Sequence, residues 1–186
     1  MRRFASWRRR VGWAIAVLLL AYTGLIGLRI LYPIAYTSQL VDAARENGLD
    51  PAFVAAVVRC ESRFKPSAVS PVGAVGLMQI MPETGAWIAE QLAVVDFTTE
   101  KLCDPDINLR FGAWYLRWLL DRFGTRNDAL MAYNAGPNRA DEWLSGSGAV
   151  FPETQGYVAR VTRSLPVYRF YFAIPWLLRI TPSLLL

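Results

Sequence analysis

The sequence predicts a mainly α protein, in which a single N-terminal transmembrane helix precedes one small helical domain. Three observations predict this class. An uncharged apolar run near the N-terminus is long enough to cross a membrane. Downstream, apolar residues recur at helical spacing between Asp-Pro, Gly and Pro signals that start and stop helices. No segment of the 186 residues shows a convincing alternation of apolar and polar side chains, the pattern that predicts a strand.

The apolar run extends from Val11 to Leu28 and follows "MRRFASWRRR", which carries five arginines. By the positive-inside rule these arginines stay in the cytoplasm and the rest of the chain crosses the membrane. We therefore expect a cytoplasmic flank at 1–10 and a single-pass anchor at 11–31 in the inner (cytoplasmic) membrane, with the domain on the periplasmic or cell-wall side. A cleaved signal peptide is the alternative, but the run exceeds the usual ~7–15 residues and no clear small-x-small cleavage site follows it.

The net charge of +5 equals the charge of the five N-terminal arginines, so the remainder of the chain is close to neutral. The excess of basic residues therefore reflects the orientation of the chain in the membrane. We expect no nucleic-acid partner. The chain has no histidine, which excludes Ser-His-Asp and Cys-His catalysis and the HExxH metal site. Carboxylates are then the best-placed groups for proton transfer near pH 7. We expect neither a cofactor nor a metal.

The helical domain is expected at 36–165, with helix boundaries set by residues that favour helix ends. Asp50-Pro51 and Asp104-Pro105 each pair a capping side chain with proline at the first helical position. Gly124 is expected to close the helix that Asp104 opens. The expected helices are 39–47, 51 to just before 66, about 82–92, 105–123, two short helices within 127–144, and 154–165.

The tail at 166–186 is apolar and aromatic, but three prolines and two arginines disfavour a second membrane span. Two interpretations remain: the tail packs on the domain, or it lies at the membrane surface beside the anchor. We slightly favour the membrane surface.

Glu61 continues an apolar helical stripe formed by Val54, Val57 and Val58, at the i, i+3, i+4 and i+7 positions. A glutamate there is open to two interpretations. It ends the helix and reaches water, or it is desolvated and holds a proton near neutral pH.

Four stretches place polar side chains beside glycine or proline, where backbone can approach a ligand closely. They are "ESRF", "GAVGLMQIMP", "AYNAGP" and "ETQGY". In this order, with an Asp-Pro-x-x-Asn helix start between the second and third, they resemble the catalytic domain of soluble lytic transglycosylases, glycoside hydrolase family 23. That family shares its fold with goose-type lysozyme, and the resemblance covers roughly 39–165.

The resemblance implies a lysozyme-like fold and a membrane-anchored enzyme that acts on peptidoglycan glycan strands. The enzyme would cleave the MurNAc-β-1,4-GlcNAc bond and leave a 1,6-anhydromuramic acid end. Glu61 matches the catalytic acid and base, and Asn108 matches a residue for which we expect a structural role. The matching substrate-binding residues are Ser62, Gln79, Met81, Tyr133, Asn134, Glu153 and Tyr157. Two alternatives keep the same fold: a goose-type muramidase that uses water, and a non-catalytic wall-binding or assembly protein.

Cys60 and Cys103 are the only cysteines, and both depart from the residues usual in the family. One disulfide in an exported domain and two buried free thiols are equally compatible with the sequence. Both cysteines precede residues of helix-associated motifs, which motivates our prediction of a Cys60–Cys103 bridge.

Overall fold

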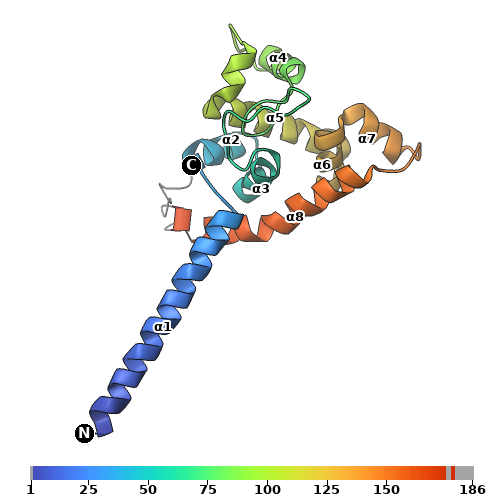
Figure 1. The fold of residues 1–186 in the computed structure, drawn as a ribbon. Helices are drawn as coiled ribbons and strands as arrows, with labels where there is room; N and C mark the ends of the chain where they lie inside the picture. The colour runs from blue at the N-terminus through green and yellow to red at the C-terminus, as the bar shows by residue number, and fades with distance from the viewer. Residues whose placement is uncertain (1, 175–176, 179–186) are drawn as a thin grey trace. The chain divides into compact units, whose positions relative to one another are not determined.

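The structure is a computed structural model that describes residues 2–174 and 177–178, and the chain divides into two compact units, Met1–Pro33 and Ile34–Leu186. The first unit contains α1 (Arg2–Leu31), shown in blue in Figure 1. Its 22-residue section Arg10–Leu31 has a mean hydropathy of 2.1. Within the described residues it is the one helix that is long and apolar enough to cross a membrane.

In the described residues of the second unit every extended regular element is a helix, which confirms the mainly α prediction. Over the described part of the chain, extended pairing is limited to the isolated bridges Val69–Val75 and Val75–Ile80. The elements in order are α2 (Thr37–Glu46), α3 (Pro51–Glu61), α4 (Pro82–Gln91), the 3-10 helix η1 (Thr99–Cys103), α5 (Pro105–Phe123), α6 (Arg126–Ala135), α7 (Pro137–Leu144) and α8 (Pro152–Ala173).

Helix starts follow the capping residues read from the sequence. The Asp50 carboxylate accepts a hydrogen bond from the Ala52 N–H at 2.9 Å, and Asp104 does the same for Asp106 at 2.9 Å. Each caps an N-terminal N–H that has no partner within its helix. Gly124 ends α5 with a φ of +76°, a conformation that costs glycine little.

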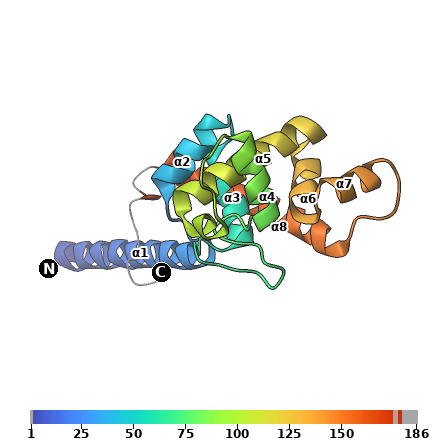
Figure 2. The ribbon, with the colours of Figure 1, turned by 90° about the horizontal axis from the view of Figure 1, so that it is seen from above.

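The core forms around α3, whose residues from Ala52 to Val58 are all buried. A helix buried on every side must have partners on every side, and α3 packs most extensively on α8 and also on α2. Figures 1 and 2 show α8, in orange to red, running alongside α3 and on to α6. The C-terminal end of α3 therefore lies among several helices that surround it.

The predicted end of the last helix at Leu165 is wrong, because α8 continues through Pro166 to Ala173. Proline removes one backbone N–H from the helix ladder, and burial of the next turns offsets that loss. Tyr168 and Tyr171 are fully buried and stack edge to face at 5.8 Å between ring centroids. The start of the expected tail is thus a packed part of the domain, whereas 175–176 and 179–186 lie outside the described residues.

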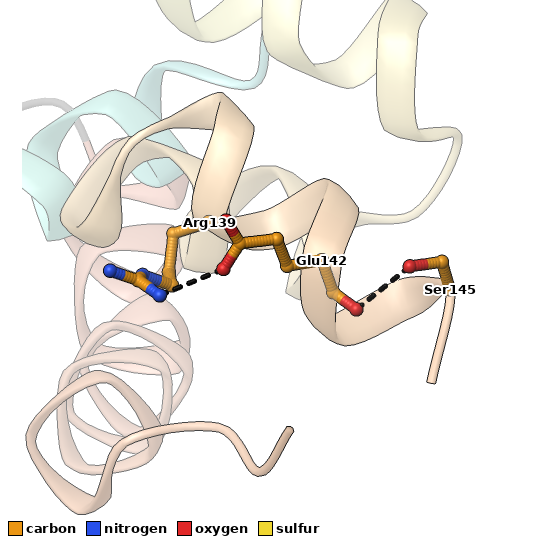
Figure 3. A network of polar contacts seen from close by, with 3 residues as sticks. All are labelled: Arg139, Glu142 and Ser145. Carbon is orange, nitrogen blue, oxygen red and sulfur yellow. Dashed lines mark hydrogen bonds and ion pairs between the residues drawn. The ribbon is translucent and has the colours of Figure 1, made fainter. Parts of the chain in front are cut away.

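Polar contacts fix α7 at its C-terminal end and against α5. Arg139 Nη1 donates to Glu142 Oε2 at 2.7 Å, and the Ser145 hydroxyl donates to the Glu142 carbonyl at 2.9 Å (Figure 3). Arg122 on α5 reaches Asp141 on α7 at 2.5 Å. The Arg122–Asp141 pair therefore links α7 to α5, whereas the other two contacts lie within α7 and its C-terminal turn.

Candidate active site

Glu61 is the last residue of α3, and the valine stripe that precedes it is completely buried. Protein atoms surround most of the carboxyl group, although the residue as a whole is partly exposed. Burial raises the pKa of Glu61 from its ordinary 4.5 to about 7, and the Tyr157 hydrogen bond and the charge of Arg160 only partly oppose this. Glu61 does end its helix, but the burial of its carboxyl group favours the interpretation in which that group is desolvated.

Tyr157 on α8 orients that carboxyl group. Its hydroxyl donates to Glu61 Oε1 at 2.6 Å, and burial raises the pKa of the phenol well above 10, so the phenol stays a donor. Among the described residues no hydrogen bond reaches Oε2. Tyr157 thus engages one carboxyl oxygen and leaves the second without a hydrogen bond from the described residues.

Tyr133 joins α6 to the loop between α3 and α4. Its hydroxyl donates to the Met78 carbonyl at 2.8 Å, in the loop between α3 and α4. Burial is the largest cause that raises the pKa of Tyr133, followed by the charge of Glu61. The contact joins the AYNAGP helix to the GLMQIMP loop next to Glu61.

The loop at 67–81 uses its polar side chains to hold its own shape. Gln79 has a φ of +50°, and its Nε2 donates to the Ala68 carbonyl at 3.1 Å and to the Gly76 carbonyl at 3.0 Å. Ser62, which follows Glu61, donates to the Leu77 carbonyl at 2.8 Å. Gln79 therefore holds the loop in its own shape, whereas Ser62 joins the loop to the end of α3. Met81 is exposed where the loop enters α4.

Asn108 on α5 anchors the same loop, which confirms its expected structural role. Its Oδ1 accepts from the Met78 N–H at 2.7 Å, and its Nδ2 donates to the carbonyls of Val75 at 3.0 Å and Leu102 at 2.8 Å. Gly76 makes room for this contact, because a Cβ there would lie 2.1 Å from Asn108 Nδ2. The side chain, itself fully buried, satisfies three backbone groups at once.

Asn134 and Glu153 lie at the surface. Both are exposed, and neither side chain has a hydrogen bond to another residue in the described part of the chain. Glu153 is in the first turn of α8, one turn before Tyr157, so it shares that side of the helix. Their roles in substrate binding remain predictions.

Sequence reasoning did not single out two features near Glu61. Arg160 lies on α8 three residues after Tyr157, and its position in "ETQGYVAR" was the available signal. An aromatic cluster also leads away from Tyr133: its ring lies 5.6 Å from Tyr115, which stacks on Trp118 at 5.8 Å. Trp87 on α4 joins this cluster at 5.2 Å from Trp118, a contact between helices that one-dimensional spacing does not predict.

The predicted Cys60–Cys103 bridge is wrong, because both cysteines are free. Cys60 is partly buried close to Arg59 and to Arg160 of α8, and burial raises its pKa. Cys103 is exposed at the end of η1, which packs on α4 and α5. The two cysteines therefore lie on different helices, α3 and η1, and no disulfide joins them.

Two observations bear on other kinds of site. Within the described residues no group of three or more His, Cys, Asp or Glu could hold a metal ion. A hollow of about 770 Å³ lies between α6 and α8, and its lining includes Met131, Val158 and Arg163 but neither Glu61 nor Tyr157. The chemistry-bearing carboxyl group is therefore separate from this hollow.

Comparison with known proteins gives a consistent result. Residues 39–153 match the family described as "Transglycosylase SLT domain". The soluble lytic murein transglycosylase of Salmonella typhimurium is 34% identical over 153 residues, which is 75% of this chain and 24% of that protein. The membrane-bound lytic murein transglycosylase C of Mannheimia succiniciproducens is 30% identical over 144 residues, covering 73% of this chain and 39% of the relative. The chain spans about a quarter of the length of the first of these relatives.

A solved structure confirms the fold. The lytic transglycosylase Slt of Pseudomonas aeruginosa, in an inactive mutant with glutamine in place of one glutamate, superposes with a TM-score of 0.73 and 35% sequence identity. The match covers 78% of this chain and 26% of that one. The helical domain therefore has the lysozyme-like fold expected from its motifs.

Proposed function

The chain belongs to the transglycosylase SLT domain family, and from this premise we propose that it is a peptidoglycan lytic transglycosylase. It cleaves the MurNAc-β-1,4-GlcNAc bond and leaves a 1,6-anhydromuramic acid end. One observation carries the proposal: a single carboxyl group, Glu61, is desolvated at the end of a buried helix and is oriented through one oxygen. The mutant relative, inactive with glutamine in place of one glutamate, supports the choice of a glutamate.

Glu61 acts first as an acid. With a pKa near 7 the group is about half protonated at neutral pH and largely protonated below it. Its Oε2 donates the proton to the glycosidic oxygen as the bond to C1 of MurNAc breaks. The N-acetyl group of the same sugar stabilises the positive charge that develops at C1. The leaving GlcNAc keeps the donated proton as its 4-hydroxyl.

Glu61 then acts as a base. Now a carboxylate, it removes the proton from the C6 hydroxyl of MurNAc, whose oxygen forms a bond to C1 and closes the 1,6-anhydro ring. Water is not consumed and the enzyme returns to its protonated state. A pKa near the working pH serves both steps, since the group must give and regain one proton. Two carboxylates, which most glycosidases need, are not required here.

The membrane anchor is part of the proposal. The apolar section of α1 supports it by length and composition, as does the similarity to a relative described as membrane-bound. The five arginines that precede the apolar run favour a cytoplasmic N-terminus. The domain then lies on the periplasmic or cell-wall side of the inner membrane, where its substrate is found.

Product analysis tests the reaction. Purified protein is incubated with intact peptidoglycan, and soluble fragments are analysed by mass spectrometry beside the Glu61→Gln variant. We expect fragments with 1,6-anhydro ends, 18 mass units lighter than their hydrolysed counterparts by the loss of one water, and a fall in rate of at least ~10³-fold in the variant.

Two outcomes would contradict the proposal. Fragments with reducing ends would identify a muramidase that uses water. Equal and negligible release by both proteins, with binding to peptidoglycan intact, would identify a non-catalytic wall-binding protein.

A further inference from the structure

Arg160 lies close to the catalytic carboxyl group, and the backbone is shaped to receive it. A Cβ added at Gly156, one turn earlier on α8, would lie 3.3 Å from Arg160 Nη1. The guanidinium group therefore folds back along α8 over Gly156, next to Tyr157. Since Tyr157 donates to Glu61 at 2.6 Å, the cation and the acid are neighbours on one side of α8.

The guanidinium group of Arg160 has no anionic partner. The residue is exposed, and no hydrogen bond or ion pair joins its guanidinium group to any residue that the structure describes. Its backbone carbonyl accepts from the Ser164 hydroxyl at 2.7 Å, which leaves the side chain unengaged. Other arginines of the domain are paired: Arg122 with Asp141, and Arg169 with Asp50. An unpaired guanidinium group beside a catalytic acid is a vacant carboxylate-binding group.

Among the charged and titratable groups that act on Glu61, Arg160 is the cation. The groups whose charges or hydrogen bonds act with Glu61 are Tyr133 on α6, Cys60 on α3, and Tyr157 and Arg160 on α8. Arg59 is nearby, but it donates to the Ser164 hydroxyl at 3.1 Å.

The proposed substrate supplies a matching anion at the right sugar. MurNAc differs from GlcNAc by a lactyl ether at O3, whose carboxyl group is either free or extended by a peptide that carries further carboxylates. A site that places C1 of MurNAc at Glu61 also brings this substituent close. GlcNAc offers no such charge.

We propose that Arg160 binds a carboxylate of the MurNAc unit that is placed at Glu61, and so selects anionic glycan strands over neutral ones. This inference rests on the proposed function, because it names the substrate feature that the same site reads. It has a consequence for the acid step. A bound carboxylate offsets the charge that lowers the pKa of Glu61, so substrate binding itself favours the protonated acid.

The test combines substitutions with substrates of different charge. Arg160→Gln removes the cation and Arg160→Lys retains the charge without the planar fork. Arg163→Gln is the matched control, because it removes the same charge from the same helix but lines the hollow facing α6. The substrates are peptide-bearing strands, strands stripped of peptide by an amidase, which have free lactyl carboxylates, and neutral N-acetylglucosamine oligomers.

We expect Arg160→Gln to raise KM about 10-fold on anionic strands, with kcat changed much less, and added salt to reduce the difference. Arg160→Lys recovers part of the loss. In Arg160→Gln the fall of kcat/KM at high pH moves to higher pH, because the pKa of free Glu61 rises. A penalty on stripped strands alone assigns the lactyl carboxylate, and a penalty on peptide-bearing strands alone assigns a carboxylate of the peptide. A penalty on both kinds of strand shows that Arg160 binds whichever carboxylate the MurNAc unit carries.

Binding of anionic strands and of neutral oligomers is measured for the Glu61→Gln protein and for the Glu61→Gln/Arg160→Gln double variant. These measurements separate this inference from the proposed function, because they need no turnover. Weaker binding of anionic but not neutral oligomers in the double variant supports it even when no turnover is found. Unchanged binding of the anionic strands overturns it. An equal loss with Arg163→Gln also overturns it, since the effect would then be general charge. Melting temperatures confirm that each variant is folded.

Discussion

The pKa of Glu61 is set by opposing effects on its carboxyl group. Burial at the end of α3 disfavours the charged form, whereas the Tyr157 hydroxyl and Arg160 favour it. Burial is the largest effect, and the resulting pKa of about 7 lies above the ordinary 4.5. This upward shift of the pKa must reduce the stability of the folded protein at every pH at which Glu61 would ionise on unfolding.

Glu61→Gln is expected to stabilise the protein in a pH-dependent way. Above pH 4.5 the unfolded chain releases the Glu61 proton, and the folded chain releases it only near pH 7, so wild-type stability falls across this window. Glutamine has no such cost. The variant should be nearly equal to wild type at pH 4 and more stable by up to about 3 kcal/mol at pH 8.

Urea unfolding of both proteins at pH 4, 6 and 8 measures this difference. Glu90→Gln, at an exposed position of α4, is the control and should track wild type at each pH. Stability curves for Glu61→Gln and wild type that stay parallel from pH 4 to 8 would mean that Glu61 ionises normally.

The elements of the domain meet at the loop between α3 and α4, which has almost no regular structure of its own. The Asn108 side chain on α5 bonds two backbone groups of the loop, at Met78 and Val75, and one carbonyl of η1. The Tyr133 hydroxyl on α6 donates to the Met78 carbonyl. Gly112 allows α5 to approach the loop, since a Cβ there would lie 2.3 Å from the Met78 sulfur. The loop that flanks Glu61 is therefore shaped by the helices around it.

Asn108→Ala should lower the free energy of unfolding by about 2–4 kcal/mol, because it leaves three buried backbone groups without partners. Asn127→Ala, at an exposed position in the first turn of α6, should change it by less than about 0.5 kcal/mol. Chemical denaturation gives both values. A loss at Asn108 no larger than at Asn127 would show that the loop keeps its shape without this side chain.

The chain as a whole combines two units of different chemistry. The first unit holds the apolar helix and the five arginines that account for the net charge of +5, and the second is close to neutral. Charge in this protein is thus concentrated where it can determine orientation in a membrane, not where it would attract a polyanion.

Cys103 provides a direct test of that orientation, because it is free and exposed. In spheroplasts expressing the full chain, a membrane-impermeant maleimide should label wild type as strongly before lysis as after it. Cys103→Ser should lose most of the label, since Cys60 is partly buried. Labelling of wild type only after lysis would place the domain in the cytoplasm.

Local sequence determined the helix starts and the apolar anchor section. Asp50 and Asp104 act on N–H groups two residues away, and a transmembrane segment is specified by its own composition. Tertiary structure decided what depends on contacts between distant segments. Burial by neighbouring helices and a hydroxyl 96 residues away set the proton affinity of Glu61. Packing carried α8 past Pro166, and the folded domain leaves Cys60 and Cys103 as free thiols. Burial and proximity are properties of the assembled core, and no local pattern encodes them.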